Sequence, residues 1–345
     1  MSLIDLIYPT YKAISIVGTS KNAGKTVTMN QIIAEAESRN IRLGLISTGR
    51  DGERRDVLTN TEKPAIYAKA GTIVTMVENS LGSDLEGNRA GIEILEVTGY
   101  NTPMGKVLMG CVQEEGYVEI SGPRSAVTIR EMCRLMQGAG AELVIVDGSL
   151  DRRASAAPFV SEGTIIAAGA AMARNMEAVI QKTEHLIELY SIPQADAEIL
   201  DIAAEAMENK QTVIVEKNGY QRIVGTQTSL NAGAAILEEL TEDARYVLLS
   251  GAVNMDTIRA VVLNCRDRVQ IVVKDATRIF LTESELFMLN KLGMDLRVLD
   301  KINVIAVTVN PYSPEGYYFE PQAFLKKMRQ AIKGIPVLDV MQEDC

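Results

Sequence analysis

The sequence predicts an α/β protein with a doubly wound, mostly parallel β-sheet. Short apolar runs of the kind buried in parallel sheets alternate along the chain with segments whose apolar residues recur at helical spacing. A glycine-bracketed loop containing Lys25 joins the first apolar run to the first helical segment. Strands that alternate with helices imply crossover connections, and these place parallel strands side by side in one sheet.

Size and composition set the outer limits of the prediction. The 345 residues, 47% of them hydrophobic and 23% charged, suffice for one large globular domain or two of ordinary size. No apolar run approaches the roughly 20 residues that span a bilayer. The opening segment MSLIDLIYP has no basic region. We therefore expect a cytoplasmic protein without a secretory signal.

Charge and cysteine content disfavour several classes of function. The chain has 35 basic and 45 acidic residues, a formal net charge of −10, and no stretch dense in Lys and Arg. We expect neither nucleic acid nor an anionic membrane as a partner, because both require a positive surface. The cysteines lie far apart without a C-x-x-C pair, which disfavours a disulfide framework or a sulfur-ligated metal. They are Cys111, Cys133, Cys265 and Cys345.

The first predicted strand runs from Ala13 to Val17 and leads at once into the loop. A helix follows and ends where its pattern breaks at Arg39-Asn40; its apolar face is formed by Val27, Ile32, Ile33 and Ala36. A second strand, Ile41 to Ser47, ends in the polar turn Thr48-Gly49-Arg50-Asp51-Gly52-Glu53. The loop is therefore expected to lie between a buried strand and an amphipathic helix.

Residues 54 to 124 give the weakest indications, and we treat them as an insertion. Val107 to Val112 and Tyr117 to Ile120 alternate in polarity, and Glu114-Glu115-Gly116 separates them. This pattern predicts a β-hairpin inserted into the parallel layout.

Regular order returns after Gly122-Pro123. One helical face is formed by Ile129, Met132, Cys133 and Met136. Buried strands follow at Leu143 to Val146, closed by Asp147-Gly148, and at Thr164 to Ala168. A long helix then presents Met176, Val179, Ile180, Thr183, Leu186, Ile187 and Tyr190 at helical spacing.

The last hundred residues repeat the alternation. Strands are predicted at Tyr246 to Leu249, Val269 to Val273, Val304 to Val309 and Pro336 to Val340, and helices near 255–264, 282–292 and 321–333. We place a core at residues 1–240, with the insertion at about 54–124, and a second α/β segment at 241–345. The sequence leaves open whether this second segment continues the core sheet or forms its own.

The segment Gly18-Thr19-Ser20-Lys21-Asn22-Ala23-Gly24-Lys25-Thr26 is the most specific feature of the chain. We interpret it as the phosphate-binding pattern G-x-x-x-x-G-K-[ST], which makes the core a P-loop NTPase. Lys25 would reach the β- and γ-phosphates of ATP, and the Thr26 hydroxyl would ligate Mg²⁺. The residues expected around the phosphates are Gly18, Asn22, Ala23, Gly24, Lys25, Thr26 and Val27. A glycine turn without a ligand is the alternative.

Acidic residues after neighbouring strands supply candidate magnesium contacts. Asp147 follows a buried strand directly, and ligands collect at the carboxyl ends of strands in open parallel sheets. We therefore assign Asp147 to the metal shell and to catalysis. Asp51, a catalytic candidate, and Glu53 could position water or contact magnesium. Each acid has a structural alternative in ordinary turn chemistry. Arg152 and Arg153 could reach the γ-phosphate or form surface ion pairs.

Asn310 directly follows the predicted strand Val304 to Val309, and we include it among the nucleotide-binding candidates. The segment after it gathers Tyr312, Tyr317, Tyr318 and Phe319. A base could stack on these rings, or the rings could cover the edge of the sheet. The lone histidine, His185, lies roughly opposite the apolar stripe of its helix. We expect it to face solvent and to serve neither catalysis nor metal binding.

Three segments together resemble the P-loop subunit of lysine aminomutase reactivase. They are the loop at 18–26, the turn Gly49-Arg50-Asp51-Gly52-Glu53 and the run Asp147-Gly148-Ser149-Leu150-Asp151-Arg152-Arg153-Ala154-Ser155. The resemblance covers most of the chain, although only the first segment is specific by itself. It implies an ATPase that works beside a MutS-like ATPase subunit to restore an adenosylcobalamin-dependent aminomutase whose cofactor is damaged.

The loop is also similar to that of dethiobiotin synthetase and its relatives. Ser20 stands where the dimer-forming ATPases of that class carry an additional lysine, and Lys21 comes one residue later. The GTP-specific motif N-K-x-D is matched only in part by Asn264-Cys265-Arg266-Asp267. Because Cys265 stands in the lysine position of this GTP-specific motif, we expect ATP as the nucleotide.

The leading hypothesis is an accessory ATPase, dependent on ATP and Mg²⁺, that acts as a reactivase or chaperone of a partner enzyme. The alternative is an ATP-dependent ligase or kinase acting on a small molecule, with the 54–124 insertion shaping its pocket. A nucleotide sensor without hydrolysis and a metallochaperone GTPase are weaker alternatives. The sequence leaves the partner, the catalytic base and the oligomeric state open, a homodimer included.

Overall fold

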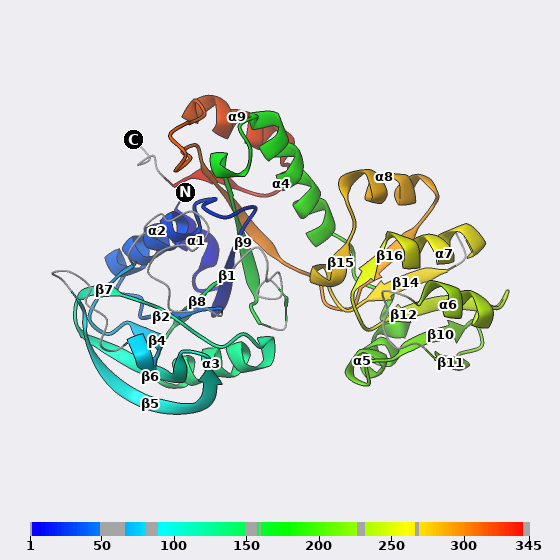
Figure 1. Ribbon diagram of the computed structural model, residues 1–345, viewed down its shortest axis with the longest axis horizontal. Coiled ribbons are helices and arrows are strands. Elements are labelled where there is room, and N and C mark those ends of the chain that lie inside the picture. The colour runs from blue at the N-terminus through cyan, green and yellow to red at the C-terminus, as the bar shows by residue number, and fades with distance from the viewer. Residues whose placement is uncertain are drawn as a thin grey trace. The chain divides into compact units, whose positions relative to one another are not determined.

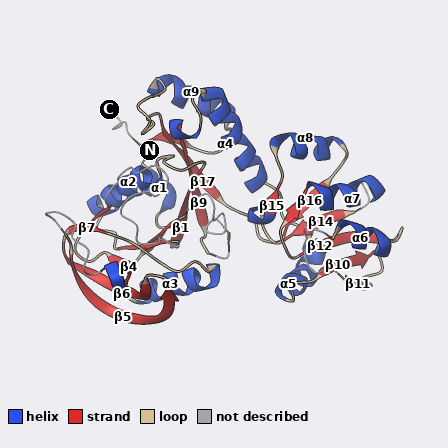
Figure 2. Cartoon of the chain, viewed as in Figure 1, coloured by secondary structure: helices blue, strands red, loops and turns tan. Residues whose placement is uncertain are grey.

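The computed structural model describes residues 2–48, 66–80, 89–148, 157–158, 160–225, 232–265 and 269–340. The chain forms two compact units: unit 1 comprises Met1–Glu184 and Asn303–Cys345, and unit 2 comprises His185–Ile302. Figures 1 and 2 show that helices and strands alternate in both units. The chain is therefore α/β, as the sequence predicts, and unit 2 is inserted into unit 1.

Unit 1 contains a nine-stranded sheet in the order β18-β17-β9-β1-β8-β2-β4-β6-β5. All neighbours from β18 to β4 are parallel, and β6 and β5 add antiparallel strands at one side. The large, mostly parallel sheet confirms the predicted layout. Its strands are β1 (Ala13–Gly18), β2 (Leu43–Ser47), β4 (Ile73–Val77), β5 (Gly91–Thr102), β6 (Gly105–Glu114), β8 (Leu143–Asp147), β9 (Gly163–Gly169), β17 (Val304–Asn310) and β18 (Val337–Asp339).

Helices cover both faces of this sheet, which makes it doubly wound. Buried residues of α1 (Leu3–Ile7) and α2 (Lys25–Ser38) share one apolar cluster with Leu143 and Ile145 of β8. The intervening residues Val144 and Val146 join a second cluster with α3 (Ala126–Gly138) on the opposite face. This alternation along β8 is the period of two that a strand buried on both faces requires. In the following text the first face is called the α2 face.

Periodicity located the helix contacts well. The buried residues of α3 are the four that the helical spacing predicts: Ile129, Met132, Cys133 and Met136. In α2, Ile32, Ile33 and Ala36 are buried as expected, whereas Val27 is half-buried and Met29 takes its place in the core. The remaining elements of unit 1 are β3 (Ile66–Ala68), β7 (Gly116–Val118), α4 (Met176–Tyr190), which continues into unit 2, and α9 (Pro321–Ala331).

The predicted hairpin between residues 107–112 and 117–120 is wrong, and the insertion instead contains a hairpin of β5 and β6. Val107 to Val112 lies in β6, which pairs with β5 across a turn closed by the Thr102 and Gly105 pair. Tyr117 lies in β7, which pairs with β3 and not with β6. Sequence reasoning missed β5, because its register shifts at three places and these bulges break the alternation of apolar and polar side chains.

Unit 2 contains a five-stranded sheet in the order β11-β10-β12-β14-β16. β12, β14 and β16 are parallel, and β10 runs antiparallel to β11 and β12. Its elements are α5 (Leu200–Glu208), β10 (Thr212–Glu216), β11 (Gln221–Val224), α6 (Gly233–Glu239), β12 (Ala244–Leu249), β13 (Val253–Asn254), α7 (Met255–Cys265), β14 (Gln270–Val273), β15 (Ile279–Phe280), α8 (Glu283–Lys291) and β16 (Asp295–Val298).

The division into units differs from the boundary expected at residue 241. That position falls between β10 and β12, which pair with each other in the sheet of unit 2. The predicted strands at 246–249 and 269–273 belong to unit 2, whereas those at 304–309 and 336–340 extend the sheet of unit 1. One part of the segment 241–345 therefore continues the sheet of unit 1, and the other part belongs to the separate sheet of unit 2.

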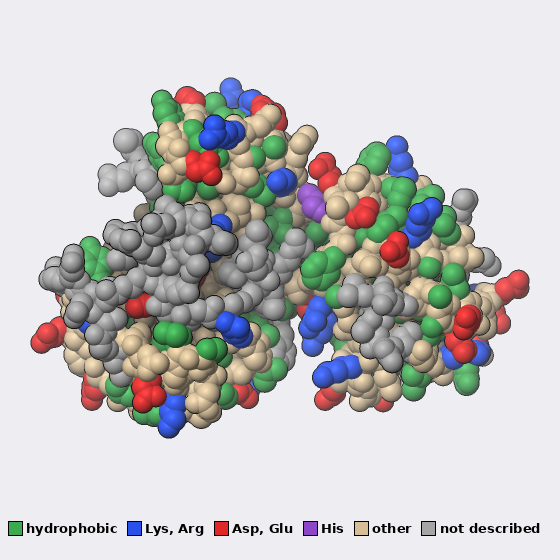
Figure 3. All heavy atoms as spheres, viewed as in Figure 1, with side chains coloured by type: hydrophobic (Ala, Val, Ile, Leu, Met, Phe, Trp, Pro, Cys, Tyr) green, Lys and Arg blue, Asp and Glu red, His purple; other side chains and the backbone are tan. Residues whose placement is uncertain are grey.

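Two surface features complete the description. None of the described helices combines the length and apolar character that crossing a membrane requires. On the face drawn in Figure 3, the described Lys and Arg side chains are scattered among Asp and Glu side chains and do not gather into a stripe.

Candidate functional site

Residues 19–24, here called the 19–24 loop, connect β1 to α2 at the carboxyl edge of the unit 1 sheet. β1 is buried along its whole length, where it pairs with β8 on one side and β9 on the other. Asn22 and Gly24 have positive φ angles of 59° and 104°. Glycine adopts this region freely and asparagine tolerates it, so the residue types match the backbone. The loop therefore turns sharply just before α2 begins.

The side chain of Lys25 folds back over the end of β1. A Cβ atom placed on Gly18 would lie 2.9 Å from Lys25 Nζ and 3.1 Å from Lys25 Cγ. It would also lie 2.9 Å from the carbonyl oxygen of Ser20. A side chain at position 18 would therefore displace the lysine, and glycine is required there by this close approach. The arrangement holds an ammonium group above the strand end and beside the main chain of the loop.

The N-terminus of α2 lacks a capping side chain. Gly24 is its N-cap residue and supplies no capping oxygen, and the first turn contains no acidic residue. The first amides of a helix have no partner within the helix, and together they carry a partial positive charge. In α2 these amides belong to Lys25, Thr26 and Val27. Their position beside the Lys25 ammonium group suits an anion better than any other ligand.

The 19–24 loop rests on the ends of two other strands. A Cβ atom on Gly169, the last residue of β9, would lie 2.6 Å from the carbonyl oxygen of Ala23. A Cβ atom on Gly24 would lie 2.8 Å from the Cβ of Asn310, the last residue of β17. Asn310 Oδ1 accepts a hydrogen bond of 3.1 Å from the N–H of Tyr312. Asn310 thus lies against the loop, and its side-chain oxygen accepts a hydrogen bond from the chain that follows.

Asp147 ends β8, the strand next to β1, and its Cα is paired in register with Ile16. Because Leu143 and Ile145 point to the α2 face, the alternation of side chains puts Asp147 on that face too. Ile14, Ile16 and Gly18 of β1 follow the same alternation. The carboxylate of Asp147 and the ammonium group of Lys25 therefore lie on the same face at the ends of adjacent strands. The carbonyl oxygen of Asp147 accepts hydrogen bonds from Thr48 N (3.0 Å) and Thr48 Oγ1 (3.1 Å), which fixes this strand end.

Thr19 corrects our interpretation of the sequence motif. Residues 19 to 23 separate Gly18 from Gly24, one residue more than the pattern G-x-x-x-x-G-K-[ST] contains, so the first pattern position falls on Thr19. Only Gly24-Lys25-Thr26 matches the pattern in place. The Thr19 side chain is 4% exposed, and its Oγ1 has no hydrogen-bond partner in the described part of the chain. A buried hydroxyl without a partner costs about 1–3 kcal/mol, which a bound ligand or water can offset.

The aromatic residues after β17 divide into two pairs. Tyr317 donates its hydroxyl hydrogen to the carbonyl oxygen of Ala170 (2.7 Å), and Phe319 is buried against Phe324 with ring centroids 5.2 Å apart. Both rings therefore serve packing. Tyr312 and Tyr318 form a bridge between their backbones, with ring centroids 6.2 Å apart, and stay 47% and 68% exposed. This second pair is available to a flat ligand.

Several predicted site residues lie outside the described residues. They are Asp51, Glu53, Arg152 and Arg153, together with most of the 49–53 and 147–155 segments that the family resemblance used. Their assigned roles stay predictions. Thr26, by contrast, is described, and it is half-buried in the first turn of α2.

The expectation for His185 is wrong in one respect. Its side chain is half-buried, and Nε2 lies 2.9 Å from the carbonyl oxygen of Leu281. The periodicity of its own helix could not reveal this contact, because Leu281 lies 96 residues further along the chain. Among the described residues, no group of three or more His, Cys, Asp and Glu side chains is placed to hold a metal ion by protein ligands alone.

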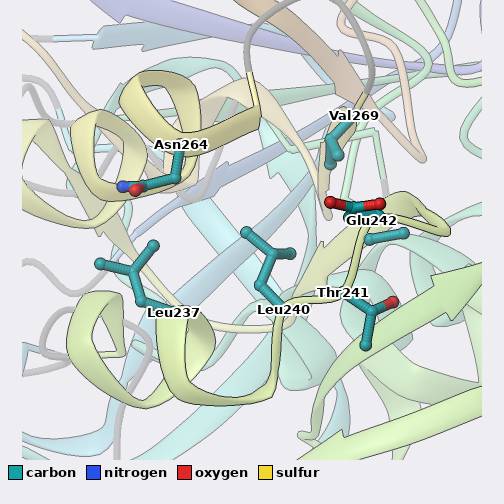
Figure 4. A pocket seen from close by; sticks show the side chains of 7 residues that line it. Leu237, Leu240, Thr241, Glu242, Asn264 and Val269 are labelled. Carbon is teal, nitrogen blue, oxygen red and sulfur yellow. The ribbon is translucent and has the colours of Figure 1, made fainter.

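A separate cavity of about 310 Å³ lies in unit 2 (Figure 4). It is lined by Leu237, Leu240, Thr241, Glu242, Ala244, Asn264 and Val269. Ala244 begins β12 and Val269 precedes β14, so the cavity lies at the amino edge of these parallel strands. Open parallel sheets bind their ligands at the opposite edge. This position sets the cavity apart from the site in unit 1.

Sequence reasoning missed two residues that shape the site in unit 1. Gly169 touches the loop, and the pattern of a buried strand ending in glycine could have indicated a close approach of two backbones. Thr48 supports Asp147 through a backbone carbonyl, which no side-chain pattern indicates.

Comparison of the chain with models of protein families, with curated proteins and with solved structures finds no match.

Proposed function

We propose that the carboxyl edge of the unit 1 sheet binds the triphosphate of ATP together with Mg²⁺, and that unit 1 is a P-loop NTPase. The observation that carries this proposal is the fold of Lys25 back over Gly18, beside the uncapped N-terminus of α2. The Lys25 ammonium group thus lies where three elements meet: a buried strand, a tight loop with left-handed residues, and a helix N-terminus. Polyphosphate is the ligand that such a combination of amides and ammonium suits.

The described residues support distinct roles in this site. The amides of the loop and of the first turn of α2 would surround the phosphates, and Lys25 would neutralise the β- and γ-phosphates. Thr26 and Asp147 would hold the hydrated magnesium ion, which in such sites takes most of its ligands from water and phosphate. The position of Asp147 on the α2 face supports this assignment, since α2 also carries Thr26.

The exposed pair of Tyr312 and Tyr318 is the candidate platform for the base. Tyr312 is held by Asn310, and Asn310 lies against Gly24 of the loop. A base stacked on this pair would belong to a nucleotide whose phosphates reach the loop. A complete guanine-specific N-K-x-D motif is absent from the sequence, since Cys265 stands in the lysine position, and this favours adenine over guanine.

Hydrolysis would serve a partner protein. The support for this part is the resemblance to the reactivase subunit, which points to a MutS-like ATPase subunit and a cobalamin-dependent aminomutase as partners. Capture of partners on immobilised protein, with and without ATP, tests it. Nucleotide-dependent recovery of such a mutase supports the proposal. Recovery of none, together with ATP turnover that a small carboxylic acid or amine stimulates, favours the ligase or kinase alternative.

Titration calorimetry with ATP and Mg²⁺ tests the nucleotide site. Lys25→Ala removes a charged hydrogen-bond donor worth about 1.5–3 kcal/mol, so ATP affinity should fall by roughly 10- to 150-fold. Lys21→Ala is the matched control, because Lys21 is an exposed lysine of the same loop. Its affinity should stay within about twofold of the unmodified protein, as expected for an exposed charge. Absence of ATP binding in the unmodified protein, or equal binding by the Lys25→Ala variant, refutes the proposal.

A further inference from the structure

We infer that unit 2 is a nucleotide-responsive module, because the chain leaves for unit 2 from a residue that touches the 19–24 loop, and the strand by which it returns ends at a second residue that touches this loop. This inference rests on the proposed binding of ATP at that loop. It assigns to unit 2 a role that neither the motif nor the cavity in unit 2 indicates. The contacts that support it lie within unit 1, at the carboxyl ends of β9, from which the chain leaves for unit 2, and of β17, the strand by which it returns.

The outgoing connection begins at Gly169. This residue touches the Ala23 carbonyl so closely that no Cβ atom fits between them. A short 3-10 turn, Ala170–Met172, follows and leads to α4. Asn175 Oδ1 caps α4 by accepting hydrogen bonds from Glu177 N (2.8 Å) and Ala178 N (3.3 Å). α4 then passes without interruption beyond Glu184, where unit 2 begins.

The returning connection is β17 itself. Unit 2 ends at Ile302, and the carbonyl oxygen of Asn303 already accepts a hydrogen bond of 2.8 Å from Thr164 N of β9. β17 then continues, after one shift of register between Val304 and Ala306, to Asn310, which lies against Gly24. No flexible linker separates unit 2 from the residue that touches the loop. A displacement of Asn310 is therefore carried along one strand.

The two connections are also joined to each other beyond the loop. The Tyr317 hydroxyl, which follows β17, donates to the carbonyl oxygen of Ala170 (2.7 Å). The Arg174 guanidinium group lies over the Tyr317 ring at 5.2 Å. Lys327 of α9 forms an ion pair with Glu177 of α4 at 2.5 Å. These contacts tie the start of α4 to the segment after β17, so the two are expected to shift together.

Nucleotide binding can move the two connections because the 19–24 loop is tightly packed against the ends of β9 and β17. Phosphates that enter would be surrounded by the amides of residues 22–27. Gly169 leaves no room for a Cβ atom against Ala23, and Gly24 leaves none against Asn310, so a shift of the loop acts on these two strand ends. Packed interfaces convert small shifts at a ligand site into movement of whole elements. ATP biases unit 2 to the extent that the nucleotide binds one loop conformation more tightly than the other.

Pulsed electron paramagnetic resonance tests the inference on the full chain. Spin labels are introduced as non-natural amino acids at two exposed positions, Arg134 of α3 in unit 1 and Phe287 of α8 in unit 2, so that the native cysteines stay in place. The distance distribution between the labels is measured without nucleotide, with ADP and with a non-hydrolysable ATP analogue plus Mg²⁺. We expect the analogue to shift the main distance, and the same shift to be lost in Lys25→Ala.

Calorimetry on the same labelled samples separates the two proposals. Binding of the analogue with an unchanged distance distribution overturns the inference and leaves the nucleotide site intact. Absence of binding overturns both. Asn175→Ala removes the cap of α4, whereas Asn175→Asp keeps a capping oxygen. Both variants should bind the analogue like the unmodified protein, and only Asn175→Ala should reduce the distance shift, by about half or more. An equal shift in all three proteins contradicts the route through α4.

Discussion

The hydroxyl oxygens of Thr28 in α2 and Thr308 in β17 lie 2.7 Å apart and both side chains are buried. This hydrogen bond ties the first turns of α2 to a strand that is two positions away from β1 in the sheet. It lies one turn further along the helix than the amides of Lys25 to Val27. The bond therefore helps to set the angle at which the helix N-terminus meets the 19–24 loop.

Removal of one hydroxyl of this pair should destabilise unit 1. Thr28→Val keeps the shape of the side chain and leaves the Thr308 hydroxyl buried without a partner, at a cost of about 1–3 kcal/mol. Thr28→Val/Thr308→Val removes both partners and should cost less than the sum of the two single variants. Urea unfolding of the three variants measures this. Strict additivity would show that the two hydroxyls do not interact.

A methyl group at Gly169 should disturb the loop. It would meet the backbone of Ala23 at 2.6 Å, and a backbone cannot rotate away as a side chain does. We expect Gly169→Ala to lower the free energy of unfolding by about 1–3 kcal/mol and to weaken ATP binding. Gly138→Ala is the matched control, since a Cβ at this helical residue meets nothing within 4 Å. It should be neutral or stabilising by up to about 1 kcal/mol. Equal stability of both variants contradicts the close approach.

Replacement of Asp147 should affect magnesium more than nucleotide. Asp147→Asn keeps the size of the side chain and removes the charge that would hold the hydrated ion. ATP affinity with Mg²⁺ should fall by about tenfold or more, the effect of losing one charged contact. ATP affinity in a chelator should be unchanged or tighter, because one negative charge is gone. Asp201→Asn in unit 2 is the control with the same chemical change. Calorimetry in the two conditions gives the result, and a loss that is independent of Mg²⁺ would contradict the assignment.

The exposed tyrosine pair should contribute to base binding. Loss of one stacking contact costs about 1–3 kcal/mol, so Tyr312→Ala and Tyr318→Ala should each weaken ATP binding by roughly 5- to 150-fold. Binding of inorganic tripolyphosphate, which has no base, should be unaffected and can be measured by competition with a fluorescent nucleotide. Equal losses for ATP and tripolyphosphate would show that the tyrosines support the loop and not the base.

Alkaline stability should depend on Cys133. Burial raises the pKa of this thiol to about 12 from the ordinary value of 9.0. The thiol stays neutral in the folded chain while it ionises in the unfolded chain, so stability present below pH 9 is lost as the pH rises toward 12. The loss is about 1.4 kcal/mol per pH unit within that window. Urea unfolding of the unmodified protein and of Cys133→Ala, at pH 8 and pH 10.5, should show a steeper decline for the unmodified protein. Parallel declines would contradict the raised pKa.

The sequence was most informative where a single local pattern decides the structure. β1 and β8 are almost entirely apolar because both of their faces are buried, and the four buried residues of α3 follow from helical spacing alone. The loop between the first strand and the first helix was located correctly. The first glycine of the pattern was wrongly assigned to Gly18, because five residues separate Gly18 from Gly24 and the pattern contains four. Structure shows that Gly18 makes room for Lys25, a role that the pattern does not define.

Long-range pairing explains the features that sequence reasoning missed. α4 is one uninterrupted helix across the unit boundary, and β17 follows unit 2 without a linker, so composition has no break at 184 or 302. β5 was missed because its bulges interrupt the alternation. His185 was assigned to solvent because its partner, a backbone carbonyl, leaves no trace in the sequence. In each case the decisive contact joins residues far apart along the chain.

β9 and β17 are adjacent parallel strands, paired from Thr164 to Gly169, and the whole of unit 2 is inserted in the crossover between them. A crossover of this kind needs only a dozen or so residues to close. The length of unit 2 is therefore not needed to close this crossover, and unit 2 is inserted into its host as a cassette. A chain in which α4 is joined to Asn303 by a short linker should keep every strand pairing of the larger sheet. Its ligand binding would be that of unit 1 alone, and any property lost with the linker would belong to unit 2.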